Sequence, residues 1–422
     1  MKNFARIISN QIKDSISSAS IVLLIGFKGS GKSFLGGKFS SSSISFFSSN
    51  NKEYLYTADA KPLNLLLGDY PRLIDGIEVK EKMLDACVLF SSTKNDGKFI
   101  LTSSKKISSS SNLASFSTVF VYPMSLYESK ESNGNVSLSS LFDRKKIEPT
   151  KLISTLSLDQ LIFSTCRGGF PKSLEVIDKE EKLKVAKSYL TKSLKSELSL
   201  ASSNKRDYST ALSIVKSYSK NLFSFEKNTF LLESAKKEKP LSKTTYYAYK
   251  KALEDIFLLN EIKPWNLSLR SKGVVISASK RCLIDPSLAI AALNLKPDDF
   301  KTSLLRFSYL FKNLVARDLL AYSQKLGGKL YYYSDRYGLD VDLVLELNDG
   351  RYALINVELG SFDIDASSKR LDKLEELILS YNKENKKYPL MEPTLKLIIT
   401  ASPRGSVRED GVVVVPIGCL KD

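Results

Sequence analysis

A short glycine-rich segment behind an apolar run limits what this chain can fold into more than any other feature. The run Ile21–Ile25 contains only Ile, Val and Leu, and it predicts a buried strand. The octet that follows, Gly26-Phe27-Lys28-Gly29-Ser30-Gly31-Lys32-Ser33, matches the pattern G-x-x-x-x-G-K-[ST], and a helical stretch begins directly behind it. Backbone N–H groups of such a loop and the N-terminus of the helix together form a cradle for phosphate groups. The segment therefore predicts a strand–loop–helix unit that binds a nucleotide, and a merely flexible glycine turn is the weaker interpretation.

Individual residues of the octet have distinct predicted roles. Lys32 is expected to reach the β- and γ-phosphates of ATP, and the Ser33 hydroxyl is expected to bind Mg²⁺. The glycines allow the backbone to close around the phosphates. The residues predicted to bind the nucleotide are Gly26, Gly29, Ser30, Gly31, Lys32, Ser33 and Phe34.

Further segments predict that this unit belongs to a parallel sheet. After a serine-rich stretch, interpreted as a loop or a weak helix end, residues 53–57 are expected to form the second strand, and residues 72–75 and 99–103 form later ones. In parallel α/β sheets, ligands bind at the carboxyl ends of the strands. Asp75 and Thr102 lie at two predicted strand ends. We therefore expect both to meet the glycine loop as catalytic residues, with Asp75 joining Ser33 at the Mg²⁺ ion.

Composition narrows the possible chemistry. The chain has no histidine, which excludes mechanisms that need a histidine base or ligand, and its four cysteines are scattered singly, which indicates neither a zinc site nor a disulfide framework. A net charge of +17 favours DNA or another polyanion as a partner, although a general lysine bias explains the same charge. No apolar stretch is long enough to span a bilayer and no signal peptide is visible, so we expect a cytoplasmic protein without membrane contact.

The rest of the chain changes character twice. Residues 151–205 have a helical, charged pattern, and helical patterns recur before the extended segment 261–265. Helices followed by a short ribbon are compatible with a winged helix-turn-helix, and equally with an ordinary helical packing domain. From about residue 297 an amphipathic helix and several strands predict a second α/β unit. The strands expected there are residues 329–333, 341–345, 352–358, 395–400 and 412–416.

Taken in order, the motifs of the whole chain resemble those of one known family. They are the glycine loop, the strand ending at Asp75, Phe99-Ile100-Leu101-Thr102-Ser103-Ser104, Tyr122-Pro123-Met124-Ser125-Leu126-Tyr127-Glu128, Gly168-Gly169-Phe170-Pro171, Ile284-Asp285-Pro286, Asp340-Val341-Asp342 and Ile355-Asn356-Val357-Glu358. They are similar to the motifs of prokaryotic AAA-type ATP-binding proteins whose C-terminal domain of unknown function is thought to be related to PD-(D/E)xK nucleases. The resemblance implies an α/β protein in four parts. These are an N-terminal P-loop AAA-type parallel sheet at 1–150, a helical lid at 151–205, a winged-helix-like middle domain at 206–295 and a C-terminal α/β nuclease-like domain at 296–422.

Several positions depart from the family's pattern where hydrolysis would occur. The acid strand of the family ends in Asp-Glu, but here it ends in Asp75-Gly76, and glycine cannot polarise an attacking water. Glu78 is an alternative for that role. Residues 113–116 lack the family's arginine, which leaves Arg167 as the candidate phosphate sensor, with a surface arginine as an equally open interpretation. The sequence thus predicts a P-loop ATPase with degraded hydrolysis motifs.

The nuclease-like domain departs further. The family's helix acid corresponds to Lys312, and the Glu-x-Lys element corresponds to Asn356-Val357-Glu358, which has lost the lysine. Active sites of this kind need clustered carboxylates for Mg²⁺ and a lysine for the attacking water. The simpler interpretation is an inactive domain kept for binding. A different acid set, formed by Asp340, Asp342 and Glu358, is the alternative that retains a metal.

Two functions stay open at this level. The first is an ATP-binding switch or weak ATPase that acts with DNA or a protein partner through its winged-helix and nuclease-like domains. Lys243, Lys250 and Lys251 on the expected recognition helix are candidate contacts to DNA phosphates, although a solvated surface lysine is the stronger interpretation for each of them. The second is a metal-dependent DNA endonuclease that ATP regulates. A winged-helix regulator with a purely structural nucleotide site is a third, less specific alternative.

Overall fold

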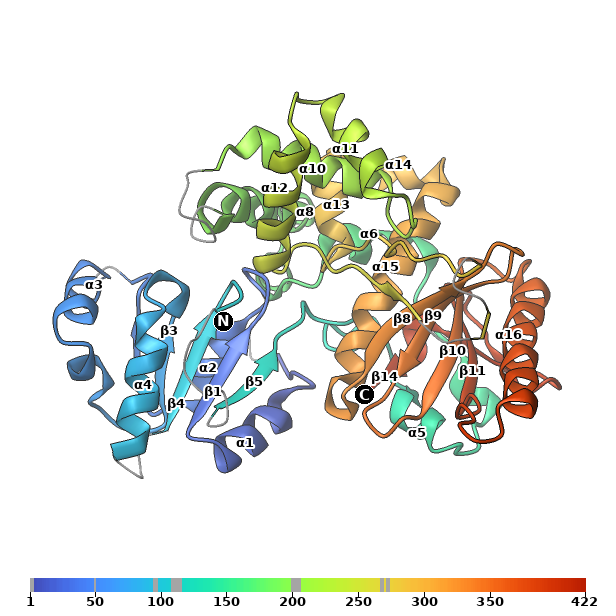
Figure 1. Cartoon of the computed structure of the whole chain (residues 1–422), viewed down its shortest axis with the longest axis horizontal. Helices are drawn as coiled ribbons and strands as arrows, with labels where there is room; N and C mark the ends of the chain where they lie inside the picture. Colours follow the sequence, from blue (N-terminus) through green and yellow to red (C-terminus); the bar gives the residue numbers. More distant parts are fainter. Residues whose placement is uncertain are drawn as a thin grey trace.

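The chain folds into an N-terminal α/β unit, a helical unit and a C-terminal α/β unit (Figure 1). In Figure 1 the helical unit lies above and between the two sheets. The computed structural model describes residues 4–48, 51–93, 98–107, 116–198, 206–265, 269–270 and 274–422.

The N-terminal sheet is entirely parallel, and its strand order is β2-β3-β4-β1-β5. β1 is an inner strand between β4 and β5, and its apolar run is buried because helices pack on both faces of the sheet, as is typical of parallel strands. This arrangement matches the P-loop AAA-type parallel sheet expected for this part of the chain. The strands are β1 (Ile21–Ile25), β2 (Ser42–Ser45), β3 (Arg72–Asp75), β4 (Phe99–Ser103) and β5 (Phe116–Phe120).

Helices cover both faces of this sheet. α1 and α2 contribute Ile12 and Leu35 to the core on one face, and α3 and α4 contribute Ala58 and Cys87 to the core on the other. The result is a three-layer unit in which the carboxyl ends of the parallel strands lie at one edge. The elements are α1 (Ser9–Ser18), α2 (Lys32–Phe39), α3 (Asn51–Ala60), η1 (Pro62–Leu66), η2 (Ile77–Val79) and α4 (Lys82–Thr93).

The prediction of a second strand at 53–57 is wrong. These residues belong to the helix α3, where Tyr54 and Ala58 face the core one turn apart. The second strand is β2, within the serine-rich stretch that was interpreted as a loop or helix end. β2 lies at the sheet edge and buries only Ile44, so it lacks the apolar run by which a strand is recognised.

A segment between the two sheets crosses from one unit to the other. After β5 the chain leaves the N-terminal sheet, and β6 (Val136–Ser137) pairs with β14 (Leu420–Lys421) near the C-terminus. α5 (Leu138–Phe142) follows and lies beside the C-terminal sheet in Figure 1. η4 (Pro149–Leu152) is followed by a bridge from Ile153 to Arg404. The division into four domains stays a prediction. The first predicted domain, residues 1–150, includes a stretch that packs on the C-terminal unit.

The helical unit has a single core that continues into the C-terminal unit. After α12 the chain forms a short ribbon, in which Leu259 bridges Leu283 and Ile262 bridges Lys280. Three helices and a ribbon are compatible with the expected winged helix, which stays a prediction. The elements are α6 (Leu158–Arg167), α7 (Pro171–Glu175), α8 (Lys179–Lys192), η5 (Ser193–Glu197), α10 (Tyr208–Lys220), α11 (Asn228–Lys236), α12 (Lys243–Asp255), α13 (Pro286–Leu293) and α14 (Asp298–Lys301).

The C-terminal sheet is mixed, with the order β12-β13-β11-β10-β9-β8-β7. Alternate residues of β9 and β10 face α15 on one side and α16 on the other, which gives a second three-layer unit. The strands expected in this part of the sequence are present. The elements are β7 (Lys263–Pro264), α15 (Leu304–Ser323), η6 (Gln324–Leu326), β8 (Lys329–Ser334), β9 (Asp340–Glu346), β10 (Tyr352–Glu358), α16 (Ile364–Glu384), β11 (Leu395–Thr400), β12 (Ser406–Val407), β13 (Val413–Pro416) and η7 (Ile417–Cys419). Among the helices of the described ranges, none has the length and hydropathy needed to cross a membrane.

Candidate nucleotide-binding site

The glycine loop joins β1 to α2 at the carboxyl edge of the parallel sheet. Gly31 has φ +99° and forms the N-cap of α2, a conformation that favours glycine. A Cβ atom at Gly26 would lie 2.4 Å from the carbonyl oxygen of Val121, so the loop enters close to the neighbouring backbone. Ser30 is fully buried, and its hydroxyl makes no hydrogen bond to the described residues. The loop thus contains a buried hydroxyl group that no described residue satisfies.

Lys32 lies inside the curve of this loop. Its ammonium group donates hydrogen bonds to the carbonyl oxygens of Gly26 at 2.9 Å and Phe27 at 3.0 Å. Burial lowers the pKa of Lys32 to about 8, while the charges of Glu78, Asp75 and Glu197 act in the opposite direction. A buried cation bound only to carbonyl oxygens and surrounded by carboxylates is suited to bind an anion in their place.

Hydroxyl groups at this edge of the sheet donate hydrogen bonds to Asp75. Its Oδ1 atom accepts hydrogen bonds of 2.6 Å from Ser33 and 2.6 Å from Thr102, and its Oδ2 atom accepts one of 2.9 Å from Ser45. Mg²⁺ prefers oxygen ligands, such as those of carboxylate and hydroxyl groups. Ser33 and Asp75 therefore fit the Mg²⁺ ion that a nucleotide would bring. Phe34 lies one residue further, in the first turn of α2.

The glycine after Asp75, Gly76, turns the chain so that Glu78 is buried near Lys32. Gly76 has φ +87° and starts the turn η2 directly after β3, which directs Glu78 inward to an exposure of 4 %. The Oε1 atom accepts a hydrogen bond of 3.1 Å from the Ser104 N–H, and Oε2 is buried without a hydrogen bond to any described residue. Burial raises the pKa of Glu78, and Lys32 opposes this shift. A partly satisfied carboxyl of this kind is a candidate general base.

The arginines near the loop differ from those expected. Arg167 is buried and makes an ion pair with Glu131, so it is neither a surface residue nor directed to the loop. Arg6 contacts the loop instead, through a hydrogen bond of 2.9 Å to the Ser30 carbonyl and one of 2.9 Å to Glu128. No sequence motif marks Arg6, because its partners are far away in the chain. Residues 113–115 of the segment that lacks the family's arginine lie outside the described part of the chain.

In the C-terminal unit, lysines neutralise the acids that would bind a metal. Lys312 donates to both carboxylate oxygens of Asp342, at 2.7 and 2.8 Å, and Lys280 lies 3.6 Å from Asp342 and 3.7 Å from Asp340. Glu358 pairs with a different cation, the Arg370 guanidinium at 2.9 Å. No group of three or more Cys, Asp or Glu side chains within the described ranges is placed to hold a metal ion. The alternative acid set therefore does not form a shared ligand cluster.

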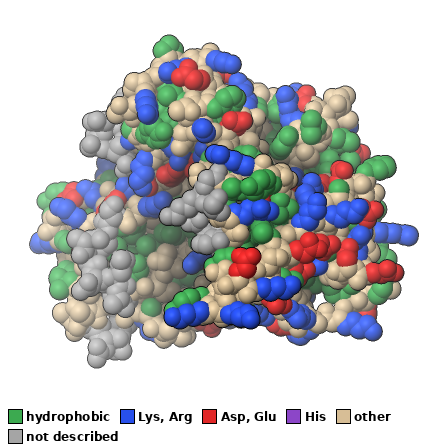
Figure 2. Space-filling view, turned by 45° about the vertical axis from the view of Figure 1, so that its right-hand side comes forward, with side chains coloured by type: hydrophobic (Ala, Val, Ile, Leu, Met, Phe, Trp, Pro, Cys, Tyr) green, Lys and Arg blue, Asp and Glu red, His purple; other side chains and the backbone are tan. Residues whose placement is uncertain are grey.

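The candidate DNA contacts on α12 are largely engaged within the protein. Lys250 pairs with Glu254 at 2.5 Å and Lys251 pairs with Asp255 at 2.7 Å, each one turn away on the same helix. Across the face shown in Figure 2, Lys and Arg side chains are interspersed with Asp and Glu. Neither observation adds support for DNA binding beyond that given by the net charge.

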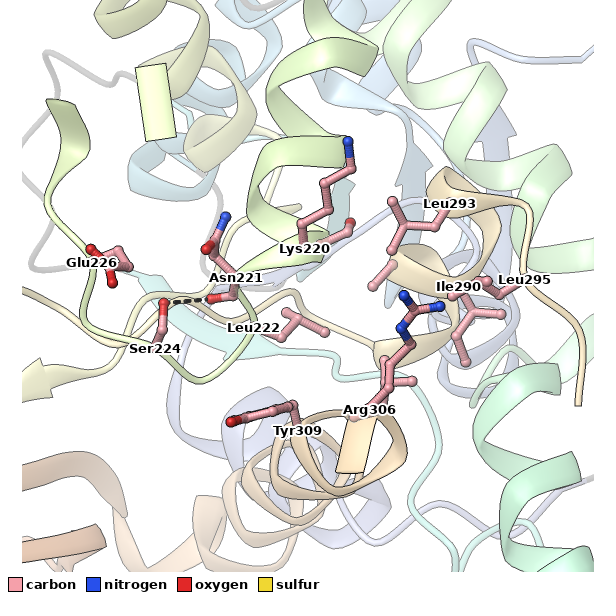
Figure 3. A pocket seen from close by; sticks show the side chains of 13 residues that line it. Lys220, Asn221, Leu222, Ser224, Glu226, Ile290, Leu293, Leu295, Arg306 and Tyr309 are labelled. Atoms are coloured by element: carbon pink, nitrogen blue, oxygen red, sulfur yellow. Dashed lines mark hydrogen bonds between the residues drawn. The ribbon is translucent and has the colours of Figure 1, made fainter. Parts of the chain in front are cut away.

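A separate cavity of about 340 Å³ lies between the helical unit and α15 (Figure 3). Figure 3 shows Arg306 and Tyr309 on the α15 side and Lys220 and Asn221 on the α10 side, with the apolar side chain of Leu222 between them. A volume above about 300 Å³ is sufficient for a small ligand. None of the lining residues belongs to the glycine loop, to the strand ends or to another motif of the sequence.

The all-parallel sheet, the glycine loop between β1 and α2, and the acid at the end of β3 define the N-terminal unit as a P-loop nucleotide-binding fold. Two other parts of the sequence match domain families. Residues 158–299 match a domain of unknown function, DUF8612, and residues 308–420 match a domain of unknown function, DUF4143. No curated protein sequence matches the chain at a significant level.

Two solved structures of ATPases are distantly similar to part of the chain. The Walker-type ATPase PABY2304 of Pyrococcus abyssi is 13% identical, with a TM-score of 0.40 over 69% of this chain and 96% of that one. The STAND protein PH0952 of Pyrococcus horikoshii, which has a tetratricopeptide repeat sensor, is 11% identical, with a TM-score of 0.21 over 74% of this chain and 49% of that one. The fold assignment rests on this chain's own strand order and loop geometry.

Proposed function

We propose that the chain is an ATP-binding, Mg²⁺-dependent P-loop switch with weak ATPase activity. The observation that carries this proposal is the joint position of Lys32, Ser33, Asp75 and Thr102 at one edge of the parallel sheet. Lys32 would contact the phosphates, and Ser33 and Asp75 would hold the Mg²⁺ ion, which neutralises charge on the phosphates when it is bound.

Glu78 is proposed to orient the attacking water in place of the missing glutamate. Its Oε2 atom, which is buried without a hydrogen bond to any described residue, and its raised pKa support this role, because a general base works best when its pKa lies nearer to the working pH. Slow turnover is expected, since this glutamate enters from a turn and not from the end of β3 itself.

DNA or a protein is proposed as the partner of the switch, reached through the middle and C-terminal units. Direct contacts between units support a coupled response: the Lys106 N–H donates to the Asp255 carbonyl of α12 at 2.7 Å, and the Leu126 N–H donates to Asp318 of α15 at 3.0 Å. The endonuclease alternative has no support from the lysine-neutralised acids.

Steady-state ATP turnover, measured with and without duplex DNA, tests the proposal. Turnover that disappears in Lys32→Ala establishes the site, and stimulation by DNA identifies the partner class. Absence of both ATP binding and turnover in the wild-type protein overturns the proposal.

A further inference from the structure

The helical unit packs directly on the glycine loop. Tyr189 of α8 lies over Gly29, since a Cβ atom at Gly29 would be 2.6 Å from the Tyr189 ring. The Phe170 ring connects the two sides, with its centroid 5.2 Å from that of Tyr189 and 6.1 Å from that of Phe27 in the loop. Phe27 is fully buried within the core of the helical unit. The position of the loop therefore depends on the helical unit as well as on the sheet.

One acidic side chain of the helical unit contacts a lysine of the loop. Glu197 ends η5, a π-helical turn that continues α8, and its carboxylate makes an ion pair with Lys28. The Glu197 side chain is 3 % exposed, and its Oε2 atom is buried without a hydrogen-bond partner among the described residues. π-helical turns are rare and occur mostly at functional positions. Burial of a half-satisfied carboxylate costs free energy, which a ligand-related role would explain.

The same carboxylate acts on the cation at the centre of the loop. Burial lowers the pKa of Lys32, and Glu197 is one of the three carboxylates whose charge opposes that shift. Carboxylate and phosphate groups are both oxyanions that form charge-assisted hydrogen bonds with ammonium groups. Of the two lysines of the octet, Lys28 is the one that Glu197 contacts, and Lys32 is the one that the motif assigns to the phosphates, so the Glu197 carboxylate lies against the loop that the motif provides for phosphate.

We propose that Glu197 is an internal anion that occupies the cationic site of the glycine loop and must leave before the phosphates of a nucleotide bind there. This inference rests on the nucleotide site proposed above. Displacement of Glu197 breaks its ion pair with Lys28 and releases the end of α8 from the loop. Because Tyr189 lies on the same continuous helix, the movement is passed to the contact with Gly29. The position of the helical unit thereby depends on whether the loop holds a nucleotide.

The inference predicts the sign of a simple substitution. A protein whose site is closed most of the time binds with an apparent affinity reduced by the fraction of open molecules. Glu197→Gln keeps the shape of the side chain but removes its charge, so the open state becomes more populated. We expect the dissociation constant of a fluorescent ATP analogue to fall by about tenfold in this variant. Glu180→Gln, an exposed glutamate in the first turn of α8, is the matched control and should bind as the wild type does.

The outcomes separate this inference from the nucleotide site itself. Equal affinity of Glu197→Gln and wild type, within twofold, leaves the site standing and overturns the role of Glu197. Weaker binding in Glu197→Gln overturns it as well, because Glu197 would then help to hold the nucleotide. If wild type and variant both fail to bind the ATP analogue, the result contradicts the proposed nucleotide site and, with it, this inference.

A measurement on the wild-type protein covers the case in which the variant does not fold. Addition of ATP should increase hydrogen exchange at the backbone amides of residues 193–198, because the turn η5 loses its anchor on the loop. Unchanged or reduced exchange in this segment, with ATP bound, contradicts displacement of Glu197.

Discussion

The Ser33 hydroxyl donates a hydrogen bond of 2.6 Å to Oδ1 of Asp75, which joins the first turn of α2 to the end of β3. The two residues are 42 positions apart in the sequence, and the parallel pairing of β1 with β4 and of β4 with β3 brings them together. The same Oδ1 atom accepts the Thr102 hydroxyl from β4. One carboxylate oxygen thus lies where the loop, the acid strand and the strand between them meet.

Replacement of Lys32 by Ala should weaken ATP binding. Hydrogen bonds to charged groups contribute about 1.5–3 kcal/mol, which corresponds to about 10- to 100-fold in affinity. A fluorescent ATP analogue provides the measurement. Lys38→Ala, at an exposed position of the same helix, should leave affinity unchanged. Equal binding by Lys32→Ala and wild type would show that the loop does not bind phosphate.

Glu78→Gln should separate turnover from binding. The substitution keeps the hydrogen bond from Ser104 but removes the proton acceptor, so ATP turnover should fall about 100-fold or more while affinity changes little. Glu81→Gln, three residues further on, should retain activity because Glu81 pairs with Lys105 instead. Retained turnover in Glu78→Gln would transfer the water-orienting role to another group.

The pH dependence of turnover should follow Glu78. Its pKa lies above the ordinary 4.5 because burial disfavours the charged form, so the carboxyl becomes protonated at a higher pH than a free glutamate does. Protonation removes the base. Turnover should therefore fall as the pH is lowered through that raised value, and the Gln variant should lack this titration. A pH–rate profile of both proteins, with folding checked at each pH, gives the answer.

Gly76→Ala should destabilise the N-terminal unit. Gly76 has φ +87°, and a Cβ atom there would lie 2.4 Å from the Phe47 ring. Such strain costs about 1–3 kcal/mol, which a lower thermal midpoint would reveal. Gly37→Ala is the opposite control, because Gly37 lies within α2 with open space around it and should gain about 0.5–1 kcal/mol. A thermal midpoint that is not lowered in Gly76→Ala would mean that the turn η2 relaxes without cost.

Lys312→Met should destabilise the C-terminal unit by about 1–3 kcal/mol, because it leaves the buried Asp342 carboxylate with poorer pairing. Lys329→Met, at an exposed end of β8, should change stability by less than about 0.5 kcal/mol. Denaturant unfolding of both variants is the measurement. If the Lys312 variant is as stable as wild type, Lys280 alone compensates the charge of Asp342.

Where the sequence carried a local signal, the structure agrees with the prediction. β1 and the loop could be predicted because a buried parallel strand is continuously apolar and the residues of the octet are contiguous in the sequence. The C-terminal strands could be predicted because they too contain runs of buried apolar residues, although their sheet is mixed. β2 could not, because an edge strand that buries only Ile44 has the composition of a loop. α3 was mistaken for a strand because β-prone Tyr54 and Thr57 outweighed the helical spacing of its core contacts.

The residues that we propose to bind phosphate and Mg²⁺ can be named from the sequence alone, since they belong to one short motif and one strand-end acid. The tertiary structure decided what surrounds them. Gly76 turns Glu78 inward, lysines neutralise Asp342, and Glu197 meets Lys28 from a position 169 residues away. These contacts depend on backbone conformation and on the packing of distant elements, which no local pattern of residues encodes.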